Sequence, residues 1–355
     1  MNRREFIKTG AFATAAALSG CTSEHISQTA KAPFFTAQGE IRAMLMHLGW
    51  NMWSDIPVTQ WGPFKGDELK IVCAADHVRT DMRVWRTVTE QMAADGYNMI
   101  VIDLGEACFY PSHPELAVKG TFSVEEMRKE LNRLRKLGLE PIPKLNFSAA
   151  HDTWLKEYER MVSTSKYYSV CADIIHDVCE IFENPRYLHL GYDEETDRHQ
   201  RRYAYSIVRK GDLWWHDFRF FVDTVEKNGS QAWIWSDFIW HHKKEFISKM
   251  PKSVLQSNWY YSKSFDLNDP VPEGYETFGH HAYLELEKAG FDQIPCGSNW
   301  SCEENFPSTV AFARKHIAPS RLKGFLNAPW FFPTVKREKH LLDACRIGRM
   351  AWDIT

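Results

Sequence analysis

The feature that most constrains the fold is a regular alternation of short apolar runs with amphipathic segments. Residues 98–104 read NMIVIDL, a nearly continuous apolar run, as expected for a strand buried on both faces of a parallel sheet. Between residues 82 and 92, apolar side chains recur at helical spacing, and Gly96 follows where a helix C-terminal glycine is favoured. The order helix, glycine, buried strand is the repeating unit of α/β proteins.

This rhythm continues to the end of the chain. Ser123 and Glu126 form a capping box that predicts a helix start, and helices are also predicted over 154–182, 213–227 and 338–350. Eight strand segments are predicted at 42–47, 98–104, 139–147, 186–191, 231–235, 254–259, 293–298 and 324–327. We therefore predict a single (β/α)8 TIM barrel. A doubly wound open sheet is the rival, but no glycine-rich phosphate loop follows the first strand.

The N-terminal segment resembles a targeting signal rather than part of the fold. Arg3 and Arg4 precede a short apolar stretch, which resembles a twin-arginine export signal. The stretch ends in LSGC, which resembles a bacterial lipobox with Cys21 as the lipidated residue. We expect an export signal over 1–20, a tether over 21–40 and a catalytic barrel over 41–355, lipid-anchored in the bacterial cell envelope, periplasmic or on the cell surface. An amphipathic first helix is the alternative.

The charge balance argues against nucleic acid as a partner, and the cysteine count indicates the state of the thiols. Lys and Arg total 43 against 46 Asp and Glu, a formal net charge of −3, which gives no electrostatic footprint for nucleic acid. The membrane is expected to be a partner only through the anchor. The cysteines other than Cys21 are odd in number, so mostly free, buried thiols are expected, although Cys296 and Cys302 could pair. These cysteines are Cys73, Cys108, Cys171, Cys179, Cys296, Cys302 and Cys345.

No metal or other cofactor is expected. The pairs His241-His242 and His280-His281 indicate a metal only weakly, because adjacent side chains point apart and no acidic residue stands at ligand spacing.

A run of acids follows the predicted fourth strand. Residues 187–195 read YLHLGYDEE, which places Asp193 and Glu194 at a strand C-terminus, the end at which barrel enzymes build their sites. Such a run can be a solvated turn or the charged first turn of the next helix. Two neighbouring carboxylates in a cleft can instead raise each other's pKa, so that one stays protonated as a general acid.

The segment 189–194, HLGYDE, is similar to the His-x-Gly-Gly-Asp-Glu signature of family 20 glycoside hydrolases, the β-N-acetylhexosaminidases. The resemblance extends through 113–151, where His151 takes the place of the histidine in the family's Pro-Gly-His, and through 172–194. It covers roughly residues 97–330.

The resemblance implies substrate-assisted retaining hydrolysis. Glu194 would protonate the leaving oxygen, the substrate's own 2-acetamido oxygen would attack the anomeric carbon, and Asp193 would orient the acetamido nitrogen. His151 would support the acid, and Tyr260 or Tyr261 would bind the acetamido oxygen. The pocket aromatics of the family would correspond to Trp235, Trp259 and Trp330.

The sequence departs from the family at four places. The first strand reads MLMHLGWNMW, without the family's arginine, and Trp330 is followed by Phe331 and Phe332 where the family has Trp-x-Glu. Tyr192 replaces the second glycine of the signature, and Lys144 stands where the third strand usually has glutamate. Each lost polar clamp would remove about 1–3 kcal/mol of sugar recognition.

Other polar residues at strand ends are candidates for sugar contacts. Asp103, Glu106 and Asp237 could bind hydroxyls, whereas His47 could line the pocket or be a core histidine. Trp214-Trp215 favours helix packing over sugar stacking.

Three hypotheses follow. The chain is a glycosidase on N-acetylhexosamine-containing glycans; a two-carboxylate glycosidase in which Asp237 or Glu106 assists Glu194 on non-acetamido sugars; or a non-catalytic surface lipoprotein that binds glycans.

Overall fold

Buried apolar strands build the centre of the molecule. In the computed structural model, β1 (Ile41–His47), β2 (Met99–Asp103) and β3 (Glu140–Lys144) run parallel, with Leu45 opposite Val101 and Val101 opposite Ile142. Every residue of β2 and β3 is buried. The continuous apolar character of these runs therefore reflects burial on both faces of the sheet.

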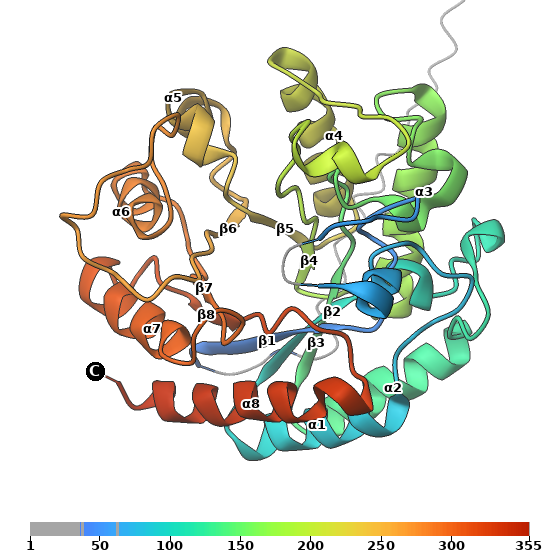
Figure 1. Ribbon diagram of the computed structural model, residues 1–355, viewed down its shortest axis with the longest axis horizontal. Helices are drawn as coiled ribbons and strands as arrows, with labels where there is room; N and C mark the ends of the chain where they lie inside the picture. The colour runs from blue at the N-terminus through green and yellow to red at the C-terminus, as the bar shows by residue number, and fades with distance from the viewer. Residues whose placement is uncertain (1–35, 37–38, 62–63, 355) are drawn as a thin grey trace, which may run out of the picture. The chain divides into compact units, whose positions relative to one another are not determined.

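The strands form an eight-stranded parallel sheet in the order β6-β5-β4-β3-β2-β1-β8-β7. Isolated bridges from Gln256 to Gln293 and from Trp259 to Cys296 join β6 to β7 and nearly close the sheet on itself. The prediction of a single (β/α)8 barrel is confirmed (Figure 1). The other strands are β4 (Tyr187–His189), β5 (Gln231–Trp235), β6 (Leu255–Ser257), β7 (Cys296–Gly297) and β8 (Gly324–Asn327).

Helices surround the strands, and α8 lies beside α1 (Figure 1). The α-helices are α1 (Met82–Ala94), α2 (Val124–Lys136), α3 (Ser165–Ile181), α4 (Asp212–Lys227), α5 (Ile239–Lys249), α6 (His280–Ala289), α7 (Asn305–His316) and α8 (Glu338–Trp352). The predicted capping box at Ser123 and Glu126 opens α2. Short 3-10 turns are η1 (Gly66–Ile71), η2 (Gly105–Ala107), η3 (Pro114–Leu116), η4 (Thr153–Tyr158), η5 (His199–Arg202) and η6 (Val335–Arg337).

The largest departure from the predicted elements lies between 154 and 182. The expected single helix is wrong, because the chain forms η4 and then α3. Lys156 (φ 51°) kinks η4 internally, and Ser163 (φ 63°) stands between η4 and α3. Thr164 caps the new start by accepting a hydrogen bond from the Tyr167 backbone. The apolar residues of this stretch are buried in both pieces, so the hydrophobic pattern alone did not reveal the break.

The hydrophobic core consists of three clusters, one inside the barrel, one between strands and helices, and one at the C-terminal end of the barrel. Alternate strand side chains, including Leu45, Val101 and Trp233, fill the barrel interior, and their neighbours on the strands pack against the helices. A third cluster, Trp50, Met52, Trp53, Val72 and Phe332, combines the segment after β1 with the segment after β8. The long insert after the first strand is thus packed onto the C-terminal end of the barrel.

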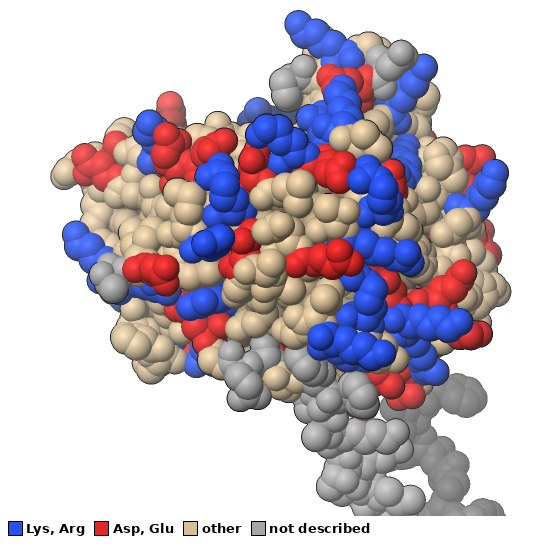
Figure 2. Space-filling view, turned by 90° about the horizontal axis from the view of Figure 1, so that it is seen from below, with Lys and Arg blue, Asp and Glu red and all other residues tan. Residues whose placement is uncertain are grey.

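The structure describes residue 36 and residues 39–61 and 64–354, which belong to one compact unit. The predicted export signal, Cys21 and most of the tether lie outside these residues. Within them, no helix combines the length and apolar character needed to cross a bilayer. On the face that carries α1 and α8, acidic and basic side chains are interspersed rather than segregated by sign (Figure 2).

Candidate active site

The segment after β4 turns sharply through three residues in the left-handed region, Gly191 (φ 69°), Tyr192 (φ 73°) and Glu194 (φ 55°). At Gly191 a Cβ atom would lie 2.1 Å from the Asn146 side-chain oxygen, so only glycine fits. Tyr192 adopts a positive φ at the position where the signature that this segment resembles has its second glycine. Non-glycine residues in this region are strained and cluster at functional sites, where surrounding contacts hold them.

The neighbouring strands hold this turn in place. Asn146, just after β3, donates to Asp193 Oδ1 at 2.8 Å and accepts from the Tyr192 backbone at 3.3 Å. Asp237, just after β5, accepts from the Glu194 backbone at 2.9 Å. The two adjacent acids are therefore fixed from both sides at the C-terminal end of the barrel.

Two histidines face the carboxylate of Glu194. His151 Nε2 lies 3.4 Å from Glu194 Oε2 and 3.4 Å from Asp193 Oδ2, and His199 Nε2 lies 3.3 Å from Glu194 Oε1. The Glu194 side chain keeps 26% of its surface exposed, so a ligand can reach it. Burial acts to raise the pKa of Glu194, but the close approach and charge of His151, with the charges of His199 and Arg202, outweigh burial and hold it below its usual value.

Asp237 has the opposite electrostatic environment. Burial, followed by the nearby charge of Asp193, raises the pKa of Asp237 to about 8. Its Oδ1 accepts from Trp259 Nε1 at 3.3 Å. A raised pKa is expected for a buried carboxyl close to other acids in a low-dielectric cleft.

The predicted pocket aromatics divide into two groups. Trp235 and Trp330 lie 5.8 Å apart between ring centroids, and Tyr261 lies 6.3 Å from Trp330 and stacks on Trp259 at 5.3 Å. Tyr260 instead packs against Phe265 and His280, away from these rings. Of the two tyrosines that the sequence could not separate, the structure brings Tyr261 to the aromatic cluster.

Buried indole N–H groups add unused donors near these rings. Trp53 lies 5.0 Å from His151 and 6.5 Å from Trp330, measured between ring centroids. The Nε1 atoms of Trp53 and Trp235 are buried and have no hydrogen-bond acceptor among the described residues. The same holds for Trp330 Nε1. Buried donors normally find a partner, so three unsatisfied N–H groups around one aromatic cluster fit a site that receives polar ligand atoms.

Asp103, predicted as a sugar contact, lies inside the barrel. Its carboxylate lies 2.5 Å from Lys144 Nζ and 3.4 Å from His47 Nδ1, and all three side chains are almost completely buried. Lys144, which stands where the family has glutamate, is thus the counter-charge of Asp103. The function of Asp103 and His47 toward a sugar stays a prediction.

Glu106, the other candidate from the second strand end, uses both carboxylate oxygens on the backbone of the loop after β1. It accepts from the backbone N–H groups of Trp50 at 2.8 Å and Asn51 at 3.0 Å. In this position Glu106 shapes the loop that carries Trp53. Its contact with a sugar also stays a prediction.

Sequence reasoning missed a buried charge network behind the acidic turn. Arg209 donates to Glu195 Oε1 at 2.7 Å and to Asp217 Oδ2 at 3.2 Å, and all three side chains are almost fully buried. Glu195 also accepts from the Ala149 backbone, two residues before His151. Tyr192, with its hydroxyl 3.2 Å from Arg209, completes the network. No sequence signal distinguished Glu195 from its acidic neighbours.

The 3-10 turn η5 was also missed, although a signal was available. Residues 197–203 read DRHQRRY and place four basic side chains directly after the acids. His199 from this turn contacts Glu194, and the charge of Arg202 acts on Glu194.

The residues that could hold a metal coincide with the candidate acid. One ligand atom each from His151, Asp193 and Glu194 lies within 4.8 Å of the others. These are also the three residues to which the resemblance assigns the acid and its support, and those roles stay a prediction. The pair His280-His281 has structural contacts instead, since Nε2 of His280 and of His281 lies 3.0 Å from the backbone oxygens of Asp266 and Asp269, respectively.

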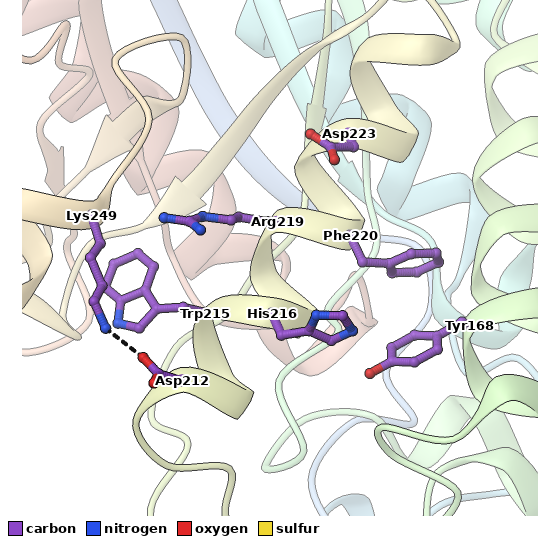
Figure 3. A pocket seen from close by; sticks show the side chains of 8 residues that line it. All are labelled: Tyr168, Asp212, Trp215, His216, Arg219, Phe220, Asp223 and Lys249. Atoms are coloured by element: carbon purple, nitrogen blue, oxygen red, sulfur yellow. Dashed lines mark hydrogen bonds and ion pairs between the residues drawn. The ribbon is translucent and has the colours of Figure 1, made fainter. Parts of the chain in front are cut away.

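A cavity of about 570 Å³ lies on the outer side of the barrel, among α3, α4 and α5 (Figure 3). It contains none of the predicted site residues, and two of its charged side chains, Asp212 and Lys249, pair at 2.9 Å. Trp215 lines this cavity, whereas Trp214 is buried and stacks on Phe238 at 3.9 Å, as expected for helix packing. The other lining residues are Tyr168, His216, Arg219, Phe220 and Asp223.

Solved structures that match this fold include family 20 glycoside hydrolases. A β-N-acetylhexosaminidase from Bacteroides fragilis matches with a TM-score of 0.58 at 13% identity over 88% of this chain and 66% of its own. An exo-β-N-acetylglucosaminidase from Vibrio harveyi in complex with N-acetylglucosamine matches with a TM-score of 0.55 at 13% identity over 89% of this chain and 57% of its own.

A third match, the β-N-acetylhexosaminidase from Streptomyces coelicolor, has a TM-score of 0.57 at 12% identity over 88% of this chain and 65% of its own. The chain therefore spans less than two thirds of the length of each of the three. At this identity the likeness shows the fold. No protein-family model and no curated protein sequence matches the chain.

Proposed function

We propose that this protein is a glycoside hydrolase that acts on N-acetylhexosamine-containing glycans by substrate-assisted retention. The observation that carries the proposal is the fixed pair Asp193 and Glu194 in a left-handed turn at the C-terminal end of a barrel, with His151 within 3.4 Å of both carboxylates. The fold shared with hexosaminidases supports the same assignment.

In the proposed reaction Glu194 protonates the leaving oxygen, because it is the more exposed of the two acids. Asp193, held by Asn146, accepts from the acetamido N–H and stabilises the positive charge that develops as the acetamido oxygen attacks. Glu194 then takes a proton from the water that opens the cyclic intermediate. The nucleophile belongs to the substrate, so no second protein carboxylate has to reach the anomeric carbon.

The aromatic cluster supplies the sugar face of the proposed site. Trp235, Trp330 and Tyr261 offer flat apolar surface to a pyranose ring. The free indole N–H groups of Trp53 and Trp235 could donate to hydroxyls in place of the arginine and glutamate that the family uses. Neutral donors bind hydroxyls more weakly than charged ones, so weaker recognition of a terminal sugar is expected.

A second candidate function is a two-carboxylate glycosidase on non-acetamido sugars. Asp237 lies at the site, where it accepts a hydrogen bond from the Glu194 backbone. Both carboxylate oxygens of Glu106 instead accept hydrogen bonds from the loop after β1. Asp237 is therefore the partner that this alternative would use.

Hydrolysis of aryl β-N-acetylglucosaminide, β-N-acetylgalactosaminide and β-glucoside by the purified protein tests the proposal. Turnover of an acetamido substrate only, reduced about a thousandfold by Glu194→Gln, is expected for loss of a general acid. The exposed Glu226→Gln is the matched control and should keep wild-type rates. Comparable turnover of the glucoside would favour the two-carboxylate alternative. Binding without turnover of any substrate would favour the non-catalytic lipoprotein.

We also propose that Cys21 anchors the protein in the cell envelope. This rests on the LSGC sequence after a twin-arginine-like segment. Cys21→Ser should move the protein from the membrane fraction to the soluble fraction of cells that express it. An unchanged membrane fraction would contradict lipidation at this residue.

A further inference from the structure

The turn η5 is fastened to the loop after β1, at the mouth of the barrel. The Ser54 hydroxyl donates to the Arg202 carbonyl, and the Tyr203 hydroxyl donates to the Met52 carbonyl at 2.9 Å. The Ala204 backbone donates to Asp55 Oδ1 at 2.9 Å. Three contacts within three residues hold the backbone of Arg202 in a defined place.

The Arg202 side chain lies across two indole rings. Its guanidinium carbon is 5.9 Å from the Trp53 ring centroid and 5.6 Å from that of Trp61. One nitrogen is 3.4 Å from the His199 carbonyl. No carboxylate of the described residues forms an ion pair with this guanidinium within 4.0 Å. A half-buried arginine held on aromatic faces keeps its planar fork of donors available for an oxyanion.

Two short contact paths connect Arg202 with the candidate acid. The first runs through His199, whose Nε2 lies 3.3 Å from Glu194 Oε1. The second runs through Trp53, whose ring meets His151 edge-on at 5.0 Å, and His151 lies 3.4 Å from Glu194 Oε2. In the proposed reaction Glu194 delivers its proton to the leaving oxygen. Side chains close to its carboxylate, such as His199 and Arg202, therefore face the part of the substrate that leaves.

We propose that Arg202 and His199 form a subsite for an anionic substituent, a carboxylate, sulfate or phosphate, on the part of the glycan that leaves. The inference rests on the proposed function and specifies its substrate class. Arg202 would bind two oxygens of the anion through its fork, and His199, whose ring nitrogens face Thr196 Oγ1 and Glu194 Oε1, would add positive charge when it is protonated. Trp61, stacked on Phe64, would form the apolar floor of the subsite.

This arrangement connects substrate binding with acid strength. The charges of His199 and Arg202 contribute to holding the pKa of Glu194 low, which disfavours the protonated form that acid catalysis needs. A substrate anion between these groups and solvent would offset their charge. An anionic leaving group would thereby favour the reactive protonation state of Glu194, and a neutral one would not.

The test compares matched aryl β-N-acetylglucosaminides whose aglycones carry either a carboxylate or a carboxamide. The ratio of their kcat/KM values is measured for wild type, Arg202→Gln and the exposed control Arg201→Gln. We expect wild type to prefer the carboxylate by about tenfold, Arg202→Gln to lose that preference, and Arg201→Gln to keep it. The ratio cancels the effect of a variant on overall activity or folding. A second pair, sulfonate against sulfonamide, separates a general oxyanion subsite from one shaped for a carboxylate.

Each outcome has a defined meaning. Equal ratios in wild type and Arg202→Gln, with both substrates turned over, would overturn the subsite and leave the proposed function standing. No turnover of any acetamido substrate, anionic or neutral, would overturn the proposed function and the subsite with it. A preference that disappears in Arg201→Gln as well would place the anion on the exposed basic surface and also overturn the subsite.

Discussion

The carboxyl of Asp237 is subject to opposing influences on its pKa. It accepts hydrogen bonds from the Glu194 backbone and from Trp259, which favours its charged form, yet burial and the charge of Asp193 dominate. Its pKa of about 8 in the folded protein lies far above that of an exposed aspartate. The folded protein therefore holds a proton here over a pH range in which the unfolded chain has released it.

This proton sets the direction of the pH dependence of stability. A carboxyl whose pKa is raised on folding destabilises the folded state progressively as pH rises from about 4 to about 8, and the effect is constant above that. Asp237→Asn removes the titration. As pH rises across this range, the unfolding free energy of the variant should therefore increase relative to that of wild type by up to about 1.4 kcal/mol per pH unit. Urea unfolding at several pH values measures the difference. Parallel stability curves for the two proteins would show that Asp237 is ionised in the folded state.

At the residue scale the sequence located the acids but not their surroundings. Asp193 and Glu194 were found because they directly follow a buried strand, a signal that is local in the sequence. Lys144 looked like a lost sugar clamp, and only the fold shows that it neutralises Asp103 from the next strand. Contacts between strands 40 or more residues apart leave no local pattern, so the ion pair could not be predicted.

At the element scale, the turn after β4 depends on α4. Arg209 precedes α4 and Asp217 lies within it, and together with Glu195 they tie that helix to the turn. The Ser163 hydroxyl also donates to Asp217 at 2.6 Å. The strained conformations of Tyr192 and Glu194 are thus held by a buried network that extends from the turn to α4 and to the segment before α3.

Removal of Arg209 should be costly. Arg209→Met leaves Glu195 and Asp217 buried without a counter-charge, so the unfolding free energy should fall by about 3–5 kcal/mol. Chemical denaturation measures this loss. Arg219→Met, an exposed arginine on the same helix, should change stability by less than about 0.5 kcal/mol and serves as the control. A loss below 1 kcal/mol for Arg209→Met would mean that solvent enters the network.

The elements themselves were predicted best where one signal dominated. The bounds of β5 and β8 agree with the predicted segments, because each is a short apolar run between clear helix ends. The kink at Lys156 within η4 and the break at Ser163 before α3 were missed, because lysine and serine rarely adopt left-handed conformations. Tertiary contacts, such as the bonds from Lys156 Nζ to the carbonyls of Glu115 and Ala117, stabilise that path.

At the scale of the whole molecule, eight alternations of strand and helix sufficed to predict the barrel, because few topologies accommodate that order. Closure of the barrel was not predictable in detail. The seam between β6 and β7 consists of isolated bridges, since both strands are short and the chain leaves each of them for a long loop. The site opens at the same end of the barrel as these loops.

The burial of the cysteine thiols shows how well the barrel excludes solvent from its interior. All seven cysteines of the described residues are free; five are buried, and Cys73 and Cys302 are half-buried. Burial raises the pKa of the five buried thiols, for Cys179 to about 12, so they are neither ionised nor accessible at neutral pH. The expectation of mostly free, buried thiols is confirmed, and the alternative pairing of Cys296 with Cys302 is wrong.

We therefore expect a maleimide to modify only Cys73 and Cys302 among these seven in the native protein and all seven after unfolding in denaturant, with peptide mapping to assign the sites. A reducing agent should leave the melting temperature unchanged, because no disulfide joins the described cysteines. Rapid native modification of Cys296 carries the most information. Cys296 forms part of the seam and lies 3.7 Å from the Tyr261 hydroxyl, so its reaction would mean that the barrel opens between β6 and β7, beside the aromatic cluster.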